Sequence, residues 1–282
     1  MIPLMGGLGN QLFQVGLGLN IQKELNREVA YTGILLDRKG LGTHRDLEVG
    51  SLITVNRQSI FAESRLILQR ILGGMGSSVF VTDSTGEPFL LSQIKSNTKV
   101  VCGYFQQLDL INNVGNEIET KFSQSPRFAS LVNAERKNQI AVHIRLGDYR
   151  TLRSANNFHG LTTADYYVRA IRKHFKDSGI TEIVIISDEP QLAYDLLAPK
   201  ISENVFNIGV MRSGNLIDHL AEISSSTAIV GSNSSFSWWG AWLASRNQDS
   251  RIIMPTPWFS NPLIKVNYLM DKKWFLMDRE LS

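Results

Sequence analysis

The chain has 282 residues, 43% of them hydrophobic, and a formal net charge of +3 with an isoelectric point near 8.9. This length allows two domains of about 150 residues each, and the mild positive charge favours an anionic ligand such as a nucleotide. The one cysteine, Cys102, excludes an internal disulfide and a cysteine-based metal site, and no lysine- or arginine-rich tract indicates a nucleic-acid partner.

The N-terminal half predicts an irregular α/β arrangement. A glycine-rich start opens a helix over residues 11–24. The segment 37–51, rich in glycine and charge, predicts a surface loop. The other predicted elements of this half are a strand over 28–32, a helix over 60–72, a strand over 99–103 and a helix over 108–122.

The C-terminal half alternates strands and helices more regularly. Its apolar runs are uniform, which is typical of parallel strands buried on both faces. The predicted strands cover 139–144, 182–186, 205–208, 228–230 and 251–254, and the predicted helices cover 164–176, 190–198, 216–223 and 237–244. Strands separated by helices of this length predict a doubly wound α/β sheet.

The boundary between the halves is predicted in the polar stretch 123–139. We therefore expect an N-terminal Rossmann-like domain over residues 1–130 and a C-terminal one over residues 131–282, with a cleft between them. The start of the chain lacks a signal-peptide pattern, and no apolar run is long enough for a transmembrane helix. We expect a cytoplasmic protein with at most peripheral membrane contact, for example through the basic segment 166–176 at the inner membrane face.

The segment HIRLGDY, residues 143–149, is the most informative functional signal. It follows a predicted buried strand, so it lies at the carboxyl edge of the sheet, where α/β proteins bind ligands. Arg145 can grip phosphate oxygens with its planar guanidinium group. His143 and Asp148 can form hydrogen bonds or move a proton. An ion pair between Arg145 and Asp148 that only braces the turn explains the heptapeptide equally well.

Two other polar loops lie at predicted strand exits or helix starts. The glycines of GGLGNQ, residues 6–11, permit close backbone approach ahead of a helix N-terminus, although a tight turn explains them about as well. In SDEP, residues 187–190, Asp188 and Glu189 could pair with a guanine edge or with ribose hydroxyls. Plain helix capping by Ser187 or Asp188 is the alternative.

The segment GSNSSFSWWGAW, residues 231–242, combines a serine-rich turn with the start of a helix. The N–H groups at this helix start would cradle a phosphate, and Phe236 could pack on a flat base. The tryptophans have a spacing more typical of core packing than of sugar stacking. We therefore assign three tryptophans to the hydrophobic core: Trp238, Trp239 and Trp242.

A ligand that carries a diphosphate explains all these polar loops together. The sequence has no Asp-x-Asp motif and no His-x-x-x-His or His-Glu-x-x-His spacing, so we expect no metal cofactor. A transferase without a metal must stabilise a leaving diphosphate with cations and N–H groups instead. Arg145 fits that role.

Five segments together resemble the ordered motifs of the family 11 glycosyltransferases, which are mainly α-1,2-fucosyltransferases: GGLGNQLFQ, GYFQ, HIRLGDY, SDEP and SNSSFSWWGAW. The resemblance implies a GT-B fold, in which two Rossmann-like domains face a cleft. It implies GDP-fucose as the donor, held chiefly by the C-terminal domain without a metal. The implied acceptor is a galactose-terminated glycan on the side of the N-terminal domain.

The resemblance also implies roles for single residues. Arg145 would bind the donor diphosphate and stabilise GDP as it leaves, and Asn10 would reach the diphosphate from the N-terminal domain. His143 would contact the donor, and Asp188 or Glu189 would lie near the guanine. The remaining donor contacts are implied for Asn233, Ser234, Ser235 and Phe236.

The chain departs from the family pattern HxRRGDY at one position, because Leu146 stands where the second arginine is expected. The implied reaction is inverting: a galactose 2-hydroxyl attacks the anomeric carbon of β-linked fucose, and GDP leaves from the opposite face. For the general base, Asp148 is the first candidate and His159 the second.

Several competing functions remain open from the sequence. The leading hypothesis is an α-1,2-fucosyltransferase for O-antigen or another surface glycan. The alternatives are a fucosyltransferase of another linkage, a relative that uses another sugar nucleotide, and a catalytically silent GDP-sugar-binding protein, which Leu146 motivates. An NAD-dependent enzyme is disfavoured because no dinucleotide fingerprint is present.

Overall fold

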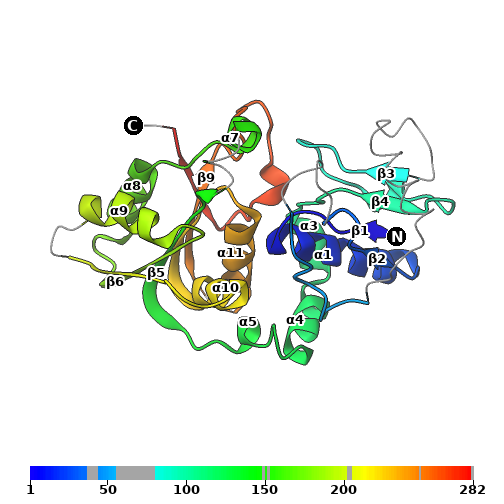
Figure 1. The fold of residues 1–282 in the computed structure, drawn as a ribbon, viewed down its shortest axis with the longest axis horizontal. Coiled ribbons are helices and arrows are strands. Elements are labelled where there is room, and N and C mark those ends of the chain that lie inside the picture. Colours follow the sequence, from blue (N-terminus) through cyan, green and yellow to red (C-terminus); the bar gives the residue numbers. More distant parts are fainter. Residues whose placement is uncertain are drawn as a thin grey trace. The chain divides into compact units, whose positions relative to one another are not determined.

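A computed structural model describes residues 1–36, 44–54, 80–147, 150, 153–201, 205–247 and 249–280. The chain divides into two compact units, which are described separately (Figure 1). The first unit is Met1–Ser125 with Asn267–Leu269, and the second is Pro126–Val266 with Met270–Ser282. The division between Ser125 and Pro126 lies inside the stretch 123–139. The return of Asn267–Leu269 to the first unit has no signal in the sequence.

The described residues of the first unit contain four short parallel strands: β1 (Ile2–Pro3), β2 (Tyr31–Thr32), β3 (Phe80–Thr82) and β4 (Val100–Cys102). β1 pairs with β2, and β3 pairs with β4. The main chain of Met1 joins the two pairs, since its N–H donates to Lys99 O at 2.8 Å and its carbonyl accepts from Val101 N at 3.0 Å. The strands therefore follow one another in the order β2, β1, β4, β3.

The helices of the first unit differ from the prediction at one point. The expected helix over 108–122 is two helices, because the backbone leaves the helical conformation at Val114, with φ −119° and ψ 21°. The predicted helix over 60–72 lies outside the described residues. The helices of this unit are α1 (Leu8–Leu25), η1 (Leu91–Gln93), α3 (Leu108–Asn113), α4 (Gly115–Gln124) and η2 (Asn267–Leu269).

The second unit is built on a six-stranded sheet whose neighbours all pair in parallel. Its strand order is β10-β9-β8-β5-β6-β7. The strands are β5 (Lys137–Ile144), β6 (Glu182–Ser187), β7 (Asn207–Val210), β8 (Ser226–Val230), β9 (Arg251–Thr256) and β10 (Phe275–Asp278). The predicted doubly wound parallel sheet and the α/β class are thus confirmed. β10 was not foreseen, because its sequence FLMD is short and lies between charged residues.

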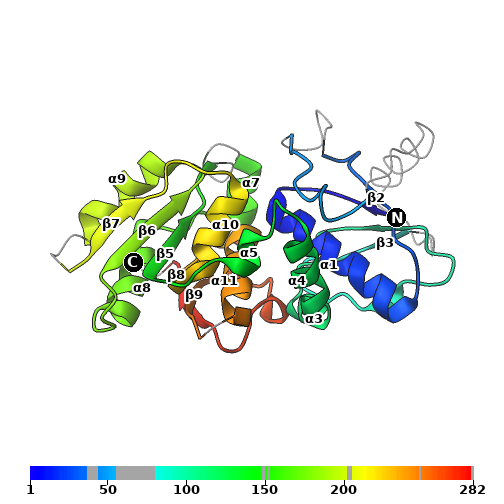
Figure 2. The same ribbon diagram turned by 90° about the horizontal axis from the view of Figure 1, so that it is seen from below.

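Helices cover both faces of this sheet, with α8 and α9 on one face and α10 and α11 on the other (Figures 1 and 2). Thr163 caps α8, and Asn215 and Asp218 form a capping box at α10. Trp238, Trp239 and Trp242 are 0%, 0% and 2% exposed, so their assignment to the core is confirmed. The helices of this unit are α5 (Ser130–Asn133), α7 (Arg153–His159), α8 (Ala164–Phe175), α9 (Pro190–Ile201), α10 (Leu216–Ser225) and α11 (Ser235–Asn247).

The chain reverses its direction of progress across the sheet between β5 and β8. From β5 it moves outward through β6 to β7, then returns to β8 and moves the other way to β10. At such a switch point the loops after the two central strands diverge and leave a crevice for a ligand. The fold therefore points to the segments that follow β5, β6 and β8. In the described part of the chain, no helix is both long and apolar enough to cross a membrane.

Candidate active site

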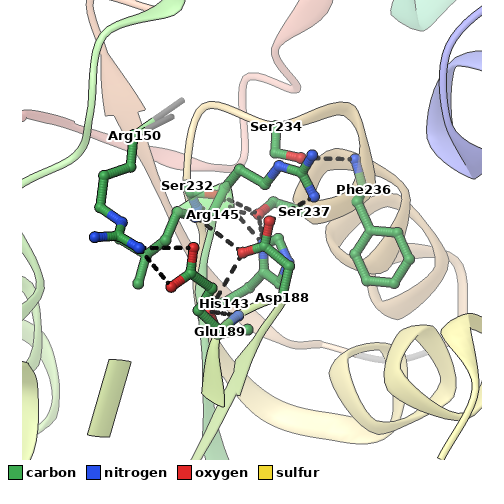
Figure 3. A network of polar contacts seen from close by, with 11 residues as sticks. His143, Arg145, Arg150, Asp188, Glu189, Ser232, Ser234, Phe236 and Ser237 are labelled. Atoms are coloured by element: carbon green, nitrogen blue, oxygen red, sulfur yellow. Dashed lines mark hydrogen bonds and ion pairs between the residues drawn. The ribbon is translucent and has the colours of Figure 1, made fainter. Parts of the chain in front are cut away.

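The segments that leave β5, β6 and β8 bring polar side chains together at the carboxyl edge of the second unit's sheet (Figure 3). β5 and β6 end at the same level, because Ile144 pairs with Ser187. β8 lies on the other side of β5, with Val230 paired to Val142. The strand register therefore gathers three of the sequence motifs, although they are far apart in the chain.

Arg145 is held in place by Asp188. Its Nη1 lies 2.8 Å from Asp188 Oδ2, and the two side chains are 25% and 26% exposed. The second carboxylate oxygen, Oδ1, accepts the N–H of Leu146 at 2.9 Å. Asp188 thus fixes both the side chain of Arg145 and the main chain that follows it.

A small residue is required beside this carboxylate. A Cβ built on Gly147 would collide with Asp188 Oδ2, so a larger residue here would force this carboxylate to shift. Leu146 is 5% exposed and belongs to the same buried cluster as Ile144 and Ile185. The side chain at this departure from the family pattern therefore packs in the core, where leucine contributes apolar burial.

The side chain of Glu189, which the sequence analysis places near the guanine with Asp188, also contacts the segment that follows β5. Its carboxylate accepts from Arg150 Nη2 at 3.0 and 3.3 Å. Ser187 Oγ accepts the N–H of Glu189 at 3.1 Å, and Glu189 O accepts from Ala193 N in the first turn of α9. Ser187 therefore closes a turn ahead of α9, while the two carboxylates pair with arginines. Helix capping by Ser187 or Asp188 stays a prediction.

His143 anchors the turn after β8. Its Nδ1 lies 2.5 Å from Ser237 Oγ and 3.2 Å from Ser232 Oγ, and Ser237 Oγ also accepts the N–H of Ser232. Burial, with an added contribution from Arg145, lowers the pKa of His143 to about 3, and Asp188 opposes that shift only partly. The imidazole is therefore neutral at neutral pH and serves as a polar anchor, since a group this weakly basic holds no proton to exchange there.

The start of α11 presents a partly exposed N-terminus beside this anchor. Phe236 packs on the His143 ring, with the ring centroids 5.2 Å apart. Its N–H donates to Ser234 Oγ at 3.3 Å, and Ser235 and Phe236 are both partly exposed. The first N–H groups of a helix carry a partial positive charge that attracts phosphate oxygens. The structure thus brings Ser234, Ser235 and Phe236 into the neighbourhood of His143.

Asn233 is engaged by the protein itself. It is 2% exposed, and its Nδ2 donates to His159 O at 2.7 Å, to Trp258 O at 3.1 Å and to Gly160 O at 3.2 Å. Its Oδ1 accepts from Thr162 Oγ1 at 3.0 Å. The Asn233 side chain therefore fastens two neighbouring loops to the turn after β8, and a donor contact by this residue stays a prediction.

Of the two candidates for the general base, the structure describes His159. Asp148 lies outside the described residues. His159 ends α7, and burial, followed by the positive charges of Arg279 and Arg145, lowers the pKa of its ring to about 4. The ring is therefore neutral at neutral pH and able to accept a proton, but only as a weak base. Among the described residues, no group of three His, Cys, Asp or Glu side chains could hold a metal ion.

In the first unit, Asn10 lies in the first turn of α1, after β1. Its Oδ1 accepts from Gln106 Nε2 at 2.7 Å, which connects the motifs GGLGNQ and GYFQ. Gly6 has a φ of 71°, a conformation that glycine adopts without strain. Asn10 and the residues of the second unit belong to different compact units, so its contact with the diphosphate stays a prediction.

Several residues that organise these segments were missed in the sequence. Asp83 accepts the N–H groups of Tyr104 and Phe105 at 2.9 and 2.7 Å, and burial raises the pKa of its carboxyl group. Arg279 is 2% exposed and donates to His159 O at 2.7 Å. Each stands outside any motif, so the sequence carries no signal for it. Ser232 and Ser237 do lie within a recognised motif, and their spacing around a helix start is the signal that could have found them.

The chain matches the model of glycosyl transferase family 11 over residues 86–277, which is more than half of its length. It is 29% identical to the Escherichia coli O-antigen biosynthesis glycosyltransferase WbnK, over 91% of this chain and 94% of that protein. It is 24% identical to an Escherichia coli alpha-1,2-colitosyltransferase, with 98% of each chain covered. Among solved structures, POFUT1 in complex with GDP matches with a TM-score of 0.46 and 12% identity, over 88% of this chain and 95% of that one. The chain belongs to glycosyl transferase family 11 and is a glycosyltransferase.

Proposed function

We propose that the protein transfers L-fucose from GDP-β-L-fucose to the 2-hydroxyl of a terminal β-galactoside, with inversion, in the synthesis of O-antigen or another surface glycan. The observation that carries the proposal is the fixed guanidinium group of Arg145, held by Asp188 beside the N-terminus of α11. A cation and N–H groups in this arrangement suit a leaving diphosphate. The O-antigen role of the relative WbnK supports the kind of product.

The proposed reaction forms a bond between the galactose O2 and the fucose anomeric carbon while the bond from that carbon to the GDP oxygen breaks. The hydroxyl proton passes to a base, for which Asp148 and His159 remain the candidates. Negative charge develops on the leaving diphosphate, and Arg145 is placed to stabilise it. An interaction that strengthens as this charge develops lowers the barrier. We propose that these groups act without a metal ion.

The test is an assay of the full chain with GDP-fucose and a panel of β-galactosides. Released GDP measures turnover, and product linkage is read by mass spectrometry and nuclear magnetic resonance. The proposal expects a single α-1,2-linked product with a subset of acceptors, at an undiminished rate when a metal chelator is present. A product with another linkage would contradict the proposed α-1,2 specificity. GDP binding without any product would indicate a catalytically silent GDP-sugar-binding protein.

A second donor is favoured by one comparison. The alpha-1,2-colitosyltransferase relative shares 24% identity over 98% of both chains. Colitose is a 3,6-dideoxyhexose, which differs from fucose only by the absence of the 3-hydroxyl. GDP-colitose is therefore the second donor to assay. Faster transfer of colitose than of fucose to the same acceptor would assign this second function.

A further inference from the structure

Three aromatic rings form an apolar patch at the end of α7. The ring of Phe158 lies 4.7 Å from that of Phe259 and 4.9 Å from that of His159, measured between centroids, and His159 and Phe259 are 5.7 Å apart. Phe158 is 43% exposed, whereas Phe259 is 7% exposed. We call Phe158, His159 and Phe259 the aromatic patch. It presents apolar surface to solvent close to a site that is otherwise polar.

The patch is fastened to the turn that precedes α11. The side chain of Asn233, from this turn, donates to the carbonyl of His159, which belongs to the patch, and to that of Trp258, which precedes Phe259. Ser260 N donates to Phe158 O at 3.0 Å, which locks the two segments of the patch to each other. Asn233 directly precedes Ser234 and the start of α11, so these hydrogen bonds connect the patch to the helix N-terminus assigned to the diphosphate. The apolar surface therefore adjoins the groups assigned to the diphosphate.

We propose that Phe158, supported by Phe259 and His159, contacts the C6 methyl group of the donor sugar and makes the enzyme selective for 6-deoxyhexoses. This inference rests on the proposed function, because it takes the donor to be a GDP-linked sugar. In such a donor the sugar follows the diphosphate directly, and the patch adjoins the groups that would hold the diphosphate. A methyl group gains from contact with an apolar ring, whereas the hydroxymethyl group at the same position would lose water without gaining a hydrogen bond.

The sharpest test compares two donors that differ only at C6. GDP-β-L-fucose carries a methyl group there, and GDP-β-L-galactose carries a hydroxymethyl group with the same ring configuration. Isothermal titration of the full chain with each donor, and with GDP alone, separates the sugar contribution from the nucleotide contribution. We expect the wild type to bind the fucose donor about 10- to 100-fold more tightly than the galactose donor, the range over which an apolar pocket discriminates against an added hydroxyl.

Phe158→Ala should narrow this preference to within about threefold by weakening the fucose donor, while the affinity for GDP alone stays the same. Phe158→Leu, which keeps apolar surface, should retain most of the preference. Phe275→Ala is the matched control, because Phe275 is a similarly exposed phenylalanine (45%) at the start of β10 in the same unit. It should leave the preference unchanged.

The outcomes separate the two proposals. An unchanged donor preference in Phe158→Ala, or an equal preference in the wild type, overturns the role of the aromatic patch while the proposed function stands. An equally reduced donor preference in Phe275→Ala also overturns the role of the aromatic patch, because the effect is then not specific to that patch. Failure of the wild type to bind GDP or either donor overturns the proposed function, and the inference falls with it.

Discussion

At the scale of single residues, the site depends on one exposed cation and one buried neutral ring. Arg145 is a quarter exposed and pairs with the carboxylate of Asp188, so its charge is preorganised and partly accessible to a ligand. His143 is 5% exposed and bonds to Ser232 in the turn before α11 and to Ser237 in the first turn of that helix. Arg145 therefore supplies positive charge to the site, and His143 holds the turn before α11 in position.

Replacement of Arg145 by alanine should lower kcat with GDP-fucose by at least about 100-fold, the effect of losing one preorganised charge contact in a transition state. GDP release measures the change. Arg145→Lys should recover only part of the activity, because lysine lacks the planar fork. Arg172→Ala is the control, since Arg172 is an exposed arginine of α8 that donates to Lys200 O. Near-normal turnover in Arg145→Ala would contradict the assigned role.

The neutral state of His143 predicts a pH dependence of stability. Its pKa is lowered from 6.5 to about 3 in the folded protein, so between these values the unfolded chain binds a proton that the folded chain does not. The free energy of unfolding should therefore fall as pH falls below 6.5, by at most about 1.4 kcal/mol per pH unit for this group.

Urea unfolding at pH 7.5, 6 and 5 checks this prediction in the wild type and in His143→Asn. The variant should be less stable at pH 7.5, because its contacts with the serines change. The slope of its unfolding free energy against pH should be smaller than that of the wild type, by the equivalent of about one bound proton. Above pH 7 the two dependences should run parallel. An equal slope in both proteins below pH 6.5 would show that His143 is not the titrating group.

At the scale of elements, the turn after β5 is shaped by its contact with β6. Asp188, one residue beyond β6, binds the side chain of Arg145 and the N–H of Leu146 across the strand exits. The β5–β6 register, with Ile144 level with Ser187, brings these groups into range. The guanidinium group of Arg145 is therefore positioned by the residue that follows the neighbouring strand β6.

Gly147→Ala should test this positioning. The added Cβ would collide with Asp188 Oδ2, so the carboxylate and with it Arg145 must move. A misplacement of about 1 Å can cost up to about 100-fold in rate, and we expect a loss of kcat of at least about tenfold, with little change in the midpoint of thermal unfolding. Gly209→Ala in β7 is the matched control, because a Cβ there meets only Ile183 O, at 3.8 Å. Equal activities of the two variants would contradict the positioning role.

At the scale of the whole molecule, the donor loops belong to one compact unit. The segments after β5, β6 and β8 all lie in the unit that begins at Pro126, whereas Asn10 lies in the other unit. Nucleotide binding should therefore change hydrogen exchange mainly in the second unit. A contribution from the first unit is expected only around Asn10.

Hydrogen exchange with and without saturating GDP checks this division. Protection should increase in peptides that cover 143–147, 187–190 and 231–237, because a bound ligand stabilises the segments that it contacts. Protection around residues 6–11 would support the predicted contact of Asn10. The amide exchange rates of strands β3 and β4 should not change on GDP binding, and these strands serve as the internal control. Protection confined to the first unit would contradict the assignment of GDP to the second.

The sequence by itself determined the doubly wound sheet of the second unit, the motifs at its strand exits and the core role of Trp238, Trp239 and Trp242. These features are local: apolar runs, helix spacing and short motifs that resemble a known family. It did not reveal the break at Val114 or the strand β10, whose short segments carry weak periodicity.

Only the tertiary structure decided which groups pair. The segment HIRLGDY suggested a pair between Arg145 and Asp148, which lies outside the described residues, whereas the structure pairs Arg145 with Asp188. The amide of Asn233 binds loops that are distant in the chain. The burial of the Leu146 side chain could not be predicted either, because the sequence identifies the residue but not the direction of its side chain. Such contacts depend on strand register and loop closure between remote segments, so the local pattern of residues cannot encode them in a readable form.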